Sequence, residues 1–295
     1  MHNIPGNISA LCAAALLAAS CLSSTKSEGG QEVIGFAPVL GTEVRSGDVS
    51  PFPEDMDFGV WAVTEDGDIY MDCSRVAYDG TGWYPEQPVA WPDGTLRFIA
   101  AAPYREDMVL EDDLSLSLGE YDLSREDGGL YVTDLTSGYG SSDRTVPLSF
   151  GRAVSMLDFR VANGLNTATS VRLEKIILKG VYLKGSFLSS SMPEWTVAGD
   201  KTDLTVYDSA VDGGNTDVTR SPQAFGKTIS IIPQKSGPVV EVVYSFQTAD
   251  SSWLTGQSET TSELKAEWEP GRYYTYTLTL TENIVKHTSG ISTAD

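Results

Sequence analysis

The sequence predicts an all-β protein, and three observations support this prediction. Short runs that alternate apolar and polar residues recur along the chain, separated by Gly, Pro, Asp and Ser. Outside the N-terminal segment, no long stretch spaces its apolar residues at i, i+3, i+4 and i+7, as an amphipathic helix would. A hydrophobic content of 41% in 295 residues is enough for the core of one large domain or of two ordinary ones.

The clearest strand pattern lies between Trp268 and Thr281. One face of this stretch carries Tyr274, Tyr276, Leu278 and Leu280, while threonines dominate the other. Such strict alternation predicts a half-buried strand, and Pro270-Gly271 supplies the turn before it. Because only the polar stretch Glu282–Asp295 follows, we expect this strand to complete sheets formed upstream.

The N-terminal half contains several shorter strand patterns. In chain order we expect strands at Glu32–Val44, Phe58–Val63, Ile69–Met71 and Leu96–Ala102. The turn residues Asp66-Gly67-Asp68 indicate that the second and third of these form a hairpin. The acidic stretch Glu106–Asp143 shows no clear pattern.

In the C-terminal half, Thr145–Val161 alternates throughout but changes phase at Gly151-Arg152. A β-bulge, or a crossing of the chain between domains, would explain this change. Further strands are expected within Val171–Phe187, Thr228–Gln234 and Val239–Gln247.

Charge is distributed unevenly over the chain. The net charge is −21, which disfavours nucleic acid and anionic membrane surfaces as partners. Residues 22–147 hold 25 acidic and 7 basic residues, whereas residues 148–295 hold 16 and 13. We therefore divide the chain into residues 32–147 and 148–295, each long enough for a β-sandwich of about seven strands.

The N-terminus is predicted to be a targeting segment. Residues 1–20 contain an apolar run that ends at Leu17-Ala18-Ala19-Ser20-Cys21, a lipobox-like sequence in which Cys21 becomes the lipidated first residue. An ordinary signal peptide or a short anchor helix is the alternative. Residues 21–31 would then form a flexible tether. Cys73 is the remaining cysteine, and we expect it to act as a small buried hydrophobe.

The residue inventory argues against an enzyme. His287 is the single histidine outside the predicted signal, so a histidine-based triad or a multi-histidine zinc site is not expected. Carboxylates are abundant, but the clusters Glu111–Asp113 and Asp66/Asp68 are predicted to be surface loops rather than a glycosidase pair. Asp212–Asp217 resembles a calcium loop only weakly. We expect no catalytic residues, metal or cofactor.

Two tryptophans are candidates for binding a sugar. Trp83 and Trp91 could stack on a pyranose ring if their indole rings are exposed, and packing in a core or a turn is the alternative. A surface-anchored glycan-binding lipoprotein is therefore the second functional hypothesis.

Several short motifs resemble those of the fimbrillin-like proteins, the type V pilins of Bacteroides-type bacteria. They are Phe58-Gly59-Val60, Trp91-Pro92 followed by Leu96–Tyr104, Pro147–Phe150 with the run that follows it, Ile232-Pro233-Gln234 and Trp268–Tyr274. Family members often carry a histidine at the position of Arg152. Together the motifs span most of the chain after the predicted signal.

This resemblance implies a fold of two tandem transthyretin-like β-sandwiches behind a lipoprotein signal. It also implies export to the outer membrane and assembly into a surface fimbrium by donor-strand exchange with other pilus subunits, with a role in adhesion to a host or bacterial surface ligand. In this mechanism a protease cuts after an arginine that follows the first strand. Arg45 stands at that position and is the candidate cleavage site, and an ordinary loop arginine is the alternative. The polar segment Glu282–Asp295 fits a tip, anchor or accessory protein better than a stalk subunit.

Overall fold

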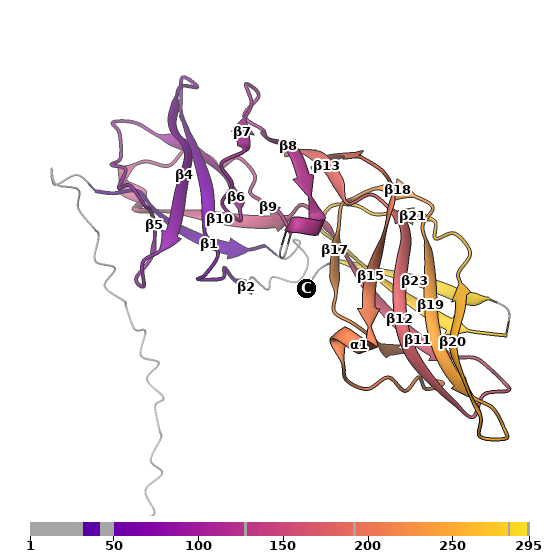
Figure 1. The fold of residues 1–295 in the computed structure, drawn as a ribbon. Coiled ribbons are helices and arrows are strands. Elements are labelled where there is room, and N and C mark those ends of the chain that lie inside the picture. The colour runs from indigo at the N-terminus through magenta and orange to yellow at the C-terminus, as the bar shows by residue number, and fades with distance from the viewer. Residues whose placement is uncertain (1–31, 42–49, 127–128, 191–192, 283, 294–295) are drawn as a thin grey trace, which may run out of the picture.

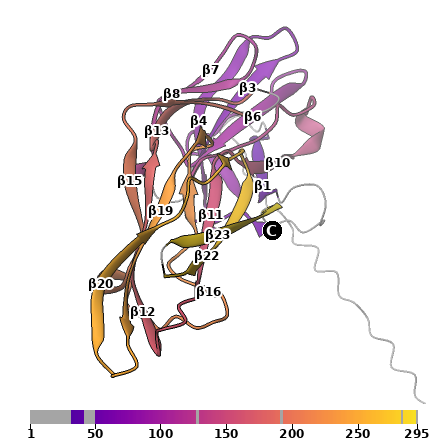
Figure 2. The same ribbon diagram turned by 90° about the vertical axis from the view of Figure 1, so that its right-hand side faces the viewer.

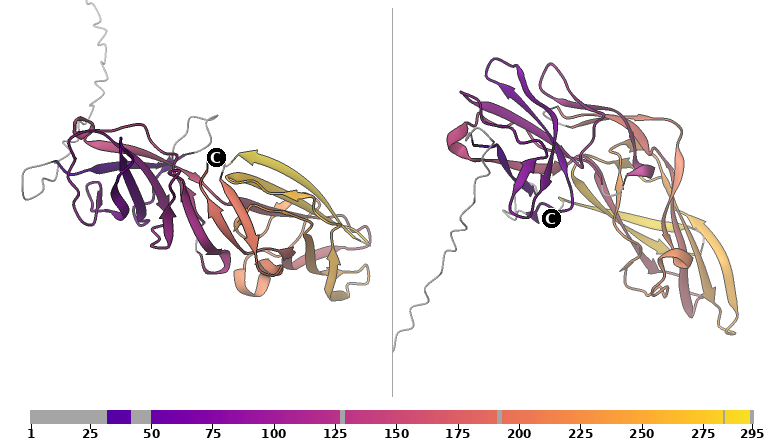
Figure 3. Two further views of the ribbon diagram at one scale, coloured as in Figure 1. Left: turned by 90° about the horizontal axis from the view of Figure 1, so that it is seen from above. Right: turned by 60° about the vertical axis from the view of Figure 1, so that its left-hand side comes forward.

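The computed structural model describes residues 32–41, 50–126, 129–190, 193–282 and 284–293. Strands account for 57% of the structure and helices for 4%, which confirms the predicted all-β class. Strands from the N-terminal and C-terminal halves of the chain gather at opposite ends of the molecule (Figures 1 and 3).

The N-terminal end is built on one eight-stranded sheet with the order β10-β9-β6-β3-β4-β5-β1-β2. Its strands are β1 (Gly35–Leu40), β2 (Ser50–Pro51), β3 (Phe58–Thr64), β4 (Ile69–Tyr78), β5 (Trp83–Pro85), β6 (Leu96–Ala102), β9 (Tyr131–Val132) and β10 (Thr145–Arg152). β1 also pairs with β10, so the sheet closes on itself. The enclosed core is rich in aromatic rings, among them Phe36, Phe52, Phe58, Phe98 and Phe150.

The C-terminal end has two sheets that share one apolar core. The first joins β16 (Gln223–Ala224), β11 (Ser155–Asn163), β22 (Arg272–Leu280) and β23 (Val285–Thr293), with β17 (Ile229–Ile231) beside β11. The second joins β15 (Thr202–Asp208), β12 (Ser170–Val181), β19 (Val239–Gln247) and β20 (Trp253–Thr260). The stacked rings of Phe159 and Tyr276, whose centroids lie 5.7 Å apart, are part of this core.

A further sheet connects the two ends of the molecule. Its order is β14-β13-β8-β7, from β7 (Met108–Leu110), β8 (Leu116–Asp122), β13 (Lys184–Leu188) and β14 (Glu194–Ala198). A hairpin from the C-terminal half of the chain thus pairs with strands of the N-terminal half. Their shared core includes Trp61, Leu118 and Phe187.

The remaining elements are short. β18 (Lys235–Ser236) pairs with β21 (Ala266–Glu267), and α1 (Ser209–Asp212) follows β15. Two 3-10 turns lie at Leu123–Arg125 and Ser141–Asp143. Among the described residues, no helix has the length and apolarity needed to cross a bilayer.

The expected strands are present, with two differences in detail. β10 spans the predicted domain boundary at residues 147/148 and stays in the N-terminal sheet, and the chain reaches the C-terminal sheets only at β11. The phase change at Gly151-Arg152 therefore marks this crossing. The division into two tandem domains stays a prediction.

The second difference concerns the C-terminus. β22 does not complete the fold as expected, because the polar stretch after it forms β23, which pairs with β22 along the whole of both strands. This strand was not predicted because its sequence is polar, and the sequence can be polar because most of the described side chains are exposed.

Candidate functional site

β1 lies between two parts of the N-terminal sheet and is the first strand that the structure describes. On one side it runs parallel to β10, with Gly35–Leu40 opposite Thr145–Phe150. On the other side it meets β5 through Phe36 and Trp83, and β2 through Val39 and Leu40. Figure 2 shows β1 beside β10, although more than 100 residues of sequence separate them. β1 therefore lies between β10 and β5 and closes the sheet.

The edge of β10 that faces β1 depends on β1 for its hydrogen bonds. The Gly41 amide donates to the Phe150 carbonyl over 2.9 Å. Because main-chain groups of successive residues point to opposite edges of a strand, those of Val146 and Leu148 also face β1. Removing β1 would therefore leave a row of unpaired amides and carbonyls along β10.

The residues just before β1 extend this pairing. Val33 forms a bridge with Ala90, and the Ile34 amide donates to the Val89 carbonyl over 2.8 Å. The Trp91 amide donates to the Glu32 carbonyl over 3.2 Å. The inserted strand therefore covers Glu32–Gly41, the described part of the predicted stretch Glu32–Val44.

The side chains of this strand alternate between the core and solvent. Ile34, Phe36 and Pro38 are buried, and Leu40 packs against the same core, while Ala37 is exposed. The Phe36 ring makes edge contacts with Phe58 and Phe98, with centroids 6.1 and 5.7 Å away. The core positions of the strand therefore occupy an apolar groove that the rest of the sheet forms.

Gly35 has its own packing requirement. A Cβ atom at this position would lie 3.0 Å from Cε1 of Tyr84 and 3.4 Å from Cγ2 of Thr145. The first distance is tighter than nine in ten real Cβ contacts, so a side chain here would require the Tyr84 ring to shift by a few tenths of an ångström, and the groove favours glycine. Aromatic packing and close approach of the backbone together define the shape that the strand must match.

The structure places the predicted ligand-stacking residues inside this core. Trp83 is 8% exposed and Trp91 is 3% exposed. The Trp83 ring packs against Phe52 and Phe58, and the Trp91 ring against Phe98. Because neither ring face is open to solvent, these tryptophans are not available for stacking on a sugar, and the alternative of core packing describes them.

The other predicted site residues fall outside the described part of the chain or among ordinary loop residues. Cys21 and Arg45 lie outside the described residues. Asp113 caps its own turn by accepting from the Ser115 amide, and the Asn215 side chain likewise accepts from the Asp217 amide. Among the described residues, no three His, Cys, Asp or Glu side chains gather as a metal site would require.

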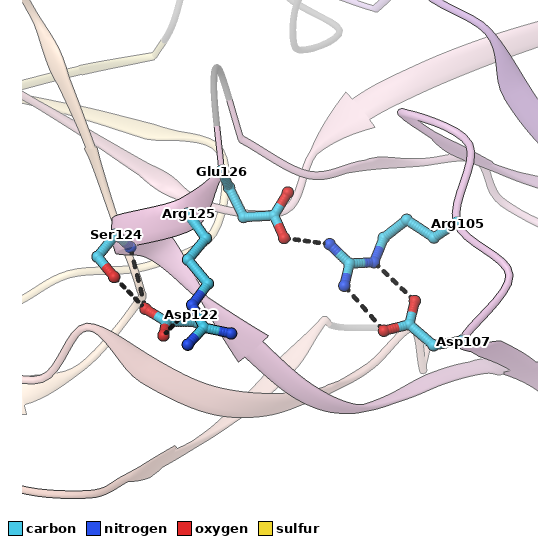
Figure 4. Close-up of polar contacts among 6 residues, drawn as sticks. All are labelled: Arg105, Asp107, Asp122, Ser124, Arg125 and Glu126. Atoms are coloured by element: carbon cyan, nitrogen blue, oxygen red, sulfur yellow. Dashed lines mark hydrogen bonds and ion pairs between the residues drawn. The ribbon is translucent and has the colours of Figure 1, made fainter.

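A cluster of ion pairs and hydrogen bonds lies where β8 pairs with β13 (Figure 4). Asp122 accepts from the Ser124 hydroxyl over 2.6 Å and forms ion pairs with Lys184 at 3.0 Å and Arg125 at 3.4 Å. The hydrogen bonds from Ser124 and Lys184 lower the pKa of Asp122 to about 2. Asp122 therefore stays ionised and ties the hairpin of the C-terminal half to β8.

Arg105 stands beside this cluster and links two further carboxylates. Its guanidinium forms a two-point ion pair with Asp107 and a third contact with Glu126 (Figure 4). It also lies 5.8 Å from the centre of the Tyr121 ring. Because the three charged groups pair with one another, we assign this cluster a structural role.

The parallel pairing of β1 with β10 was missed at the sequence level. Both segments were expected to be strands, but nothing in either sequence specifies its partner. The one available signal was the matched alternation of apolar residues, at Ile34 and Phe36 in one strand and at Val146 and Leu148 in the other.

The comparisons with known proteins identify the family of this chain and proteins with the same fold. The model of the family described as fimbrillin-like matches residues 45–293. No curated protein matches the chain.

Solved structures give the same fold at low sequence identity. A fimbrial protein from Bacteroides vulgatus is 14% identical, with a TM-score of 0.60 over 88% of this chain and 99% of its own. Proposed cell adhesion proteins from Bacteroides uniformis and Bacteroides ovatus are both 15% identical. Their TM-scores are 0.59 and 0.56, over 88% and 90% of this chain and 98% of each of theirs. At such identities these structures establish the fold alone.

Proposed function

Because the chain belongs to the fimbrillin-like family, we propose that it is a subunit of a surface pilus, or an accessory protein at its tip, which assembles by donor-strand exchange. In this proposal β1 leaves the groove and a strand from a neighbouring molecule takes its place. The protein then acts by assembly and adhesion, without catalysis.

The observation that carries this proposal is the position of β1. It is inserted between β10 and β5, and its contacts with the body of the sheet are non-covalent apart from the chain that leads on to β2. A cut between β1 and β2 would therefore leave β1 held only by hydrogen bonds and apolar contacts. A donated strand can restore both, which is β-augmentation.

The cut is proposed to fall after Arg45, between Gly41 at the end of the described first strand and Ser50 in β2. The lipid on Cys21 would hold the uncut protein at the outer membrane, and cutting after Arg45 would release it from that anchor. One proteolytic step would thus both free the subunit and open its groove.

Isolated surface filaments provide the test. In cells that express the chain, we expect filament-bound protein to begin at Ser46, and protein in the membrane fraction to begin at a lipid-modified Cys21, as read by N-terminal sequencing and mass spectrometry. The Arg45→Ala variant should remain in the membrane fraction. Filaments whose subunits still carry residues 32–45 would contradict the exchange mechanism.

A further inference from the structure

We propose that the strand which replaces β1 comes from a different polypeptide and not from the C-terminal strand of a second copy. The donor runs parallel to β10 and presents an apolar residue, a glycine, an aromatic residue and a second apolar residue where β1 has Ile34, Gly35, Phe36 and Leu40. This inference rests on the proposed function and names the partner that the groove fits.

The groove is selective because two adjacent positions have opposite requirements. At Phe36 a large ring is needed to fill the space between Phe58 and Phe98, and the residue is only 3% exposed. At Gly35 a side chain is crowded, because a Cβ would lie 3.0 Å from the Tyr84 ring, which would have to shift. The groove therefore favours a donor with a glycine directly before its aromatic anchor.

A third position tolerates a residue without an amide hydrogen. Pro38 lies between Phe36, which pairs with β5, and the Val39–Leu40 pair, which meets β2. On that side no described strand lies opposite Pro38, so its missing N–H leaves no acceptor unpaired. A proline is thus compatible with the donor at this position, while Ala37 faces solvent and sets no requirement.

The chain's own C-terminal strand does not match this pattern. If Gly290 of β23 takes the place of Gly35, then Ser289 takes that of Ile34, which is fully buried. If instead Val285 and Ile291 take the places of Ile34 and Leu40, Lys286 falls on Gly35 and His287 on Phe36. Each register puts a polar side chain into the apolar groove, which costs free energy without a hydrogen-bond partner.

β23 is also held within its own sheet. Its residues from Val285 to Thr293 pair with β22 from Arg272 to Leu280 without interruption, and the Val285 side chain is 1% exposed in the C-terminal core. Donating β23 would break this ladder and uncover that core. β1 itself is the strand that leaves, so neither of these two strands of a second copy is the donor, and we infer that the donor lies on another protein.

Peptide replacement in the folded protein tests this inference. The full chain carries an inserted recognition site for a sequence-specific protease between Gly41 and Ser50, so cutting does not depend on Arg45. The protein is folded first and cut afterwards. Fluorescent peptides are then added in excess, and the peptide that co-elutes with the protein is measured by size-exclusion chromatography.

Four peptides give a matched series. We expect a peptide of residues 32–44 and its Ala37→Ser variant to replace β1 to the same extent, since position 37 is exposed. The Phe36→Ala peptide should bind at least roughly 100-fold more weakly, as expected for an emptied aromatic site. A peptide of residues 284–293 should not enter, and the cut protein alone should form no polymer ladder on a gel.

The possible results separate the two proposals. A ladder formed by the cut protein alone, or entry of the 284–293 peptide at the level of the 32–44 peptide, would overturn the inference of a different donor while leaving strand exchange standing. Failure of the native 32–44 peptide to enter would overturn strand exchange itself, and with it the inference.

Discussion

Cys73 shows how a single side chain is controlled by its surroundings. It is half-buried, and its thiol donates to the Arg105 carbonyl over 3.1 Å. Burial, followed by the nearby Asp72, Glu106 and Asp107 carboxylates, raises the pKa of Cys73 to about 11. Cys73 was expected to be a small buried hydrophobe, and the structure instead leaves it half-buried against the core that contains Trp61.

We predict that Cys73 reacts slowly with iodoacetamide at pH 8. In a chain that begins at residue 22, Cys73 is the single thiol. Its rate should be roughly tenfold or more below that of a Thr255→Cys thiol placed on exposed β20, because little of the Cys73 thiol is ionised. The difference should vanish in urea. Equal rates in the folded protein would show that burial and the nearby carboxylates do not suppress ionisation of the Cys73 thiol.

Asp122 gives a prediction about acid stability. Its pKa of about 2 in the folded protein lies below the usual value of about 3.9. A lowered carboxyl pKa contributes stability that is complete above the unfolded pKa and is lost as the pH falls toward the folded value. The free energy of unfolding should therefore decline between about pH 5 and pH 2 partly because Asp122 becomes protonated.

The Asp122→Asn variant tests this contribution. At pH 7 we expect a loss of about 1.5 kcal/mol, since the ion pairs with Lys184 and Arg125 are removed while an amide oxygen can still accept from Ser124. The difference from the parent should shrink toward pH 2. The exposed Asp200→Asn change is the control in urea denaturation. A constant difference across this pH range would exclude the proposed linkage.

At the scale of the element, β1 contributes stability through side chains as well as hydrogen bonds. We predict that Phe36→Ala lowers the free energy of unfolding by about 3 to 5 kcal/mol, because it leaves a cavity between Phe58 and Phe98. The neighbouring Ala37→Ser change should have almost no effect, since Ala37 is exposed. Chemical denaturation of both variants measures the difference, and equal stabilities would mean that β1 is not anchored by this ring.

Local patterns predicted the strands well but not their partners. Alternation at Tyr274 and Tyr276 predicted β22 correctly, because period-two alternation is a property of the strand alone. The pairing of β1 with β10 depends on the three-dimensional path of the chain between them, which no local pattern encodes. β23 was missed because its exposed position allows polar residues at most sites.

The tryptophans failed as site predictions for a related reason. The sequence around Trp83 and Trp91 is rich in turn residues, which left both exposure and burial open. Burial is decided by Phe52 and Phe98, which reach these rings from other parts of the sheet. The candidate site therefore had to be found from the sheet topology.

At the scale of the whole molecule, the β13–β14 hairpin links the two ends. Phe187 of β13 pairs with Leu118 of β8, is 3% exposed, and lies in a core with Trp61 of β3. Trp195 of β14 packs on Phe187 and donates from its indole nitrogen to the Ala153 carbonyl over 2.7 Å. Residues from the C-terminal half of the sequence thus complete a core of the N-terminal half.

Because the core is shared, we predict that a destabilising substitution in the β13–β14 hairpin also destabilises strands from the N-terminal half of the chain. The Phe187→Ala variant should be about 3 to 5 kcal/mol less stable and should lose protection from hydrogen exchange in β8, from Leu116 to Asp122, although these residues precede it by more than 60 positions. The reason is that β8 has β13 as one of its two neighbours in the sheet. Leu254→Ala on the exposed edge strand β20 is the control and should leave exchange in β8 unchanged. If β8 keeps its protection in Phe187→Ala while β13 loses it, the two ends are coupled by the covalent chain alone and a pilus subunit of this kind would transmit little force through its core.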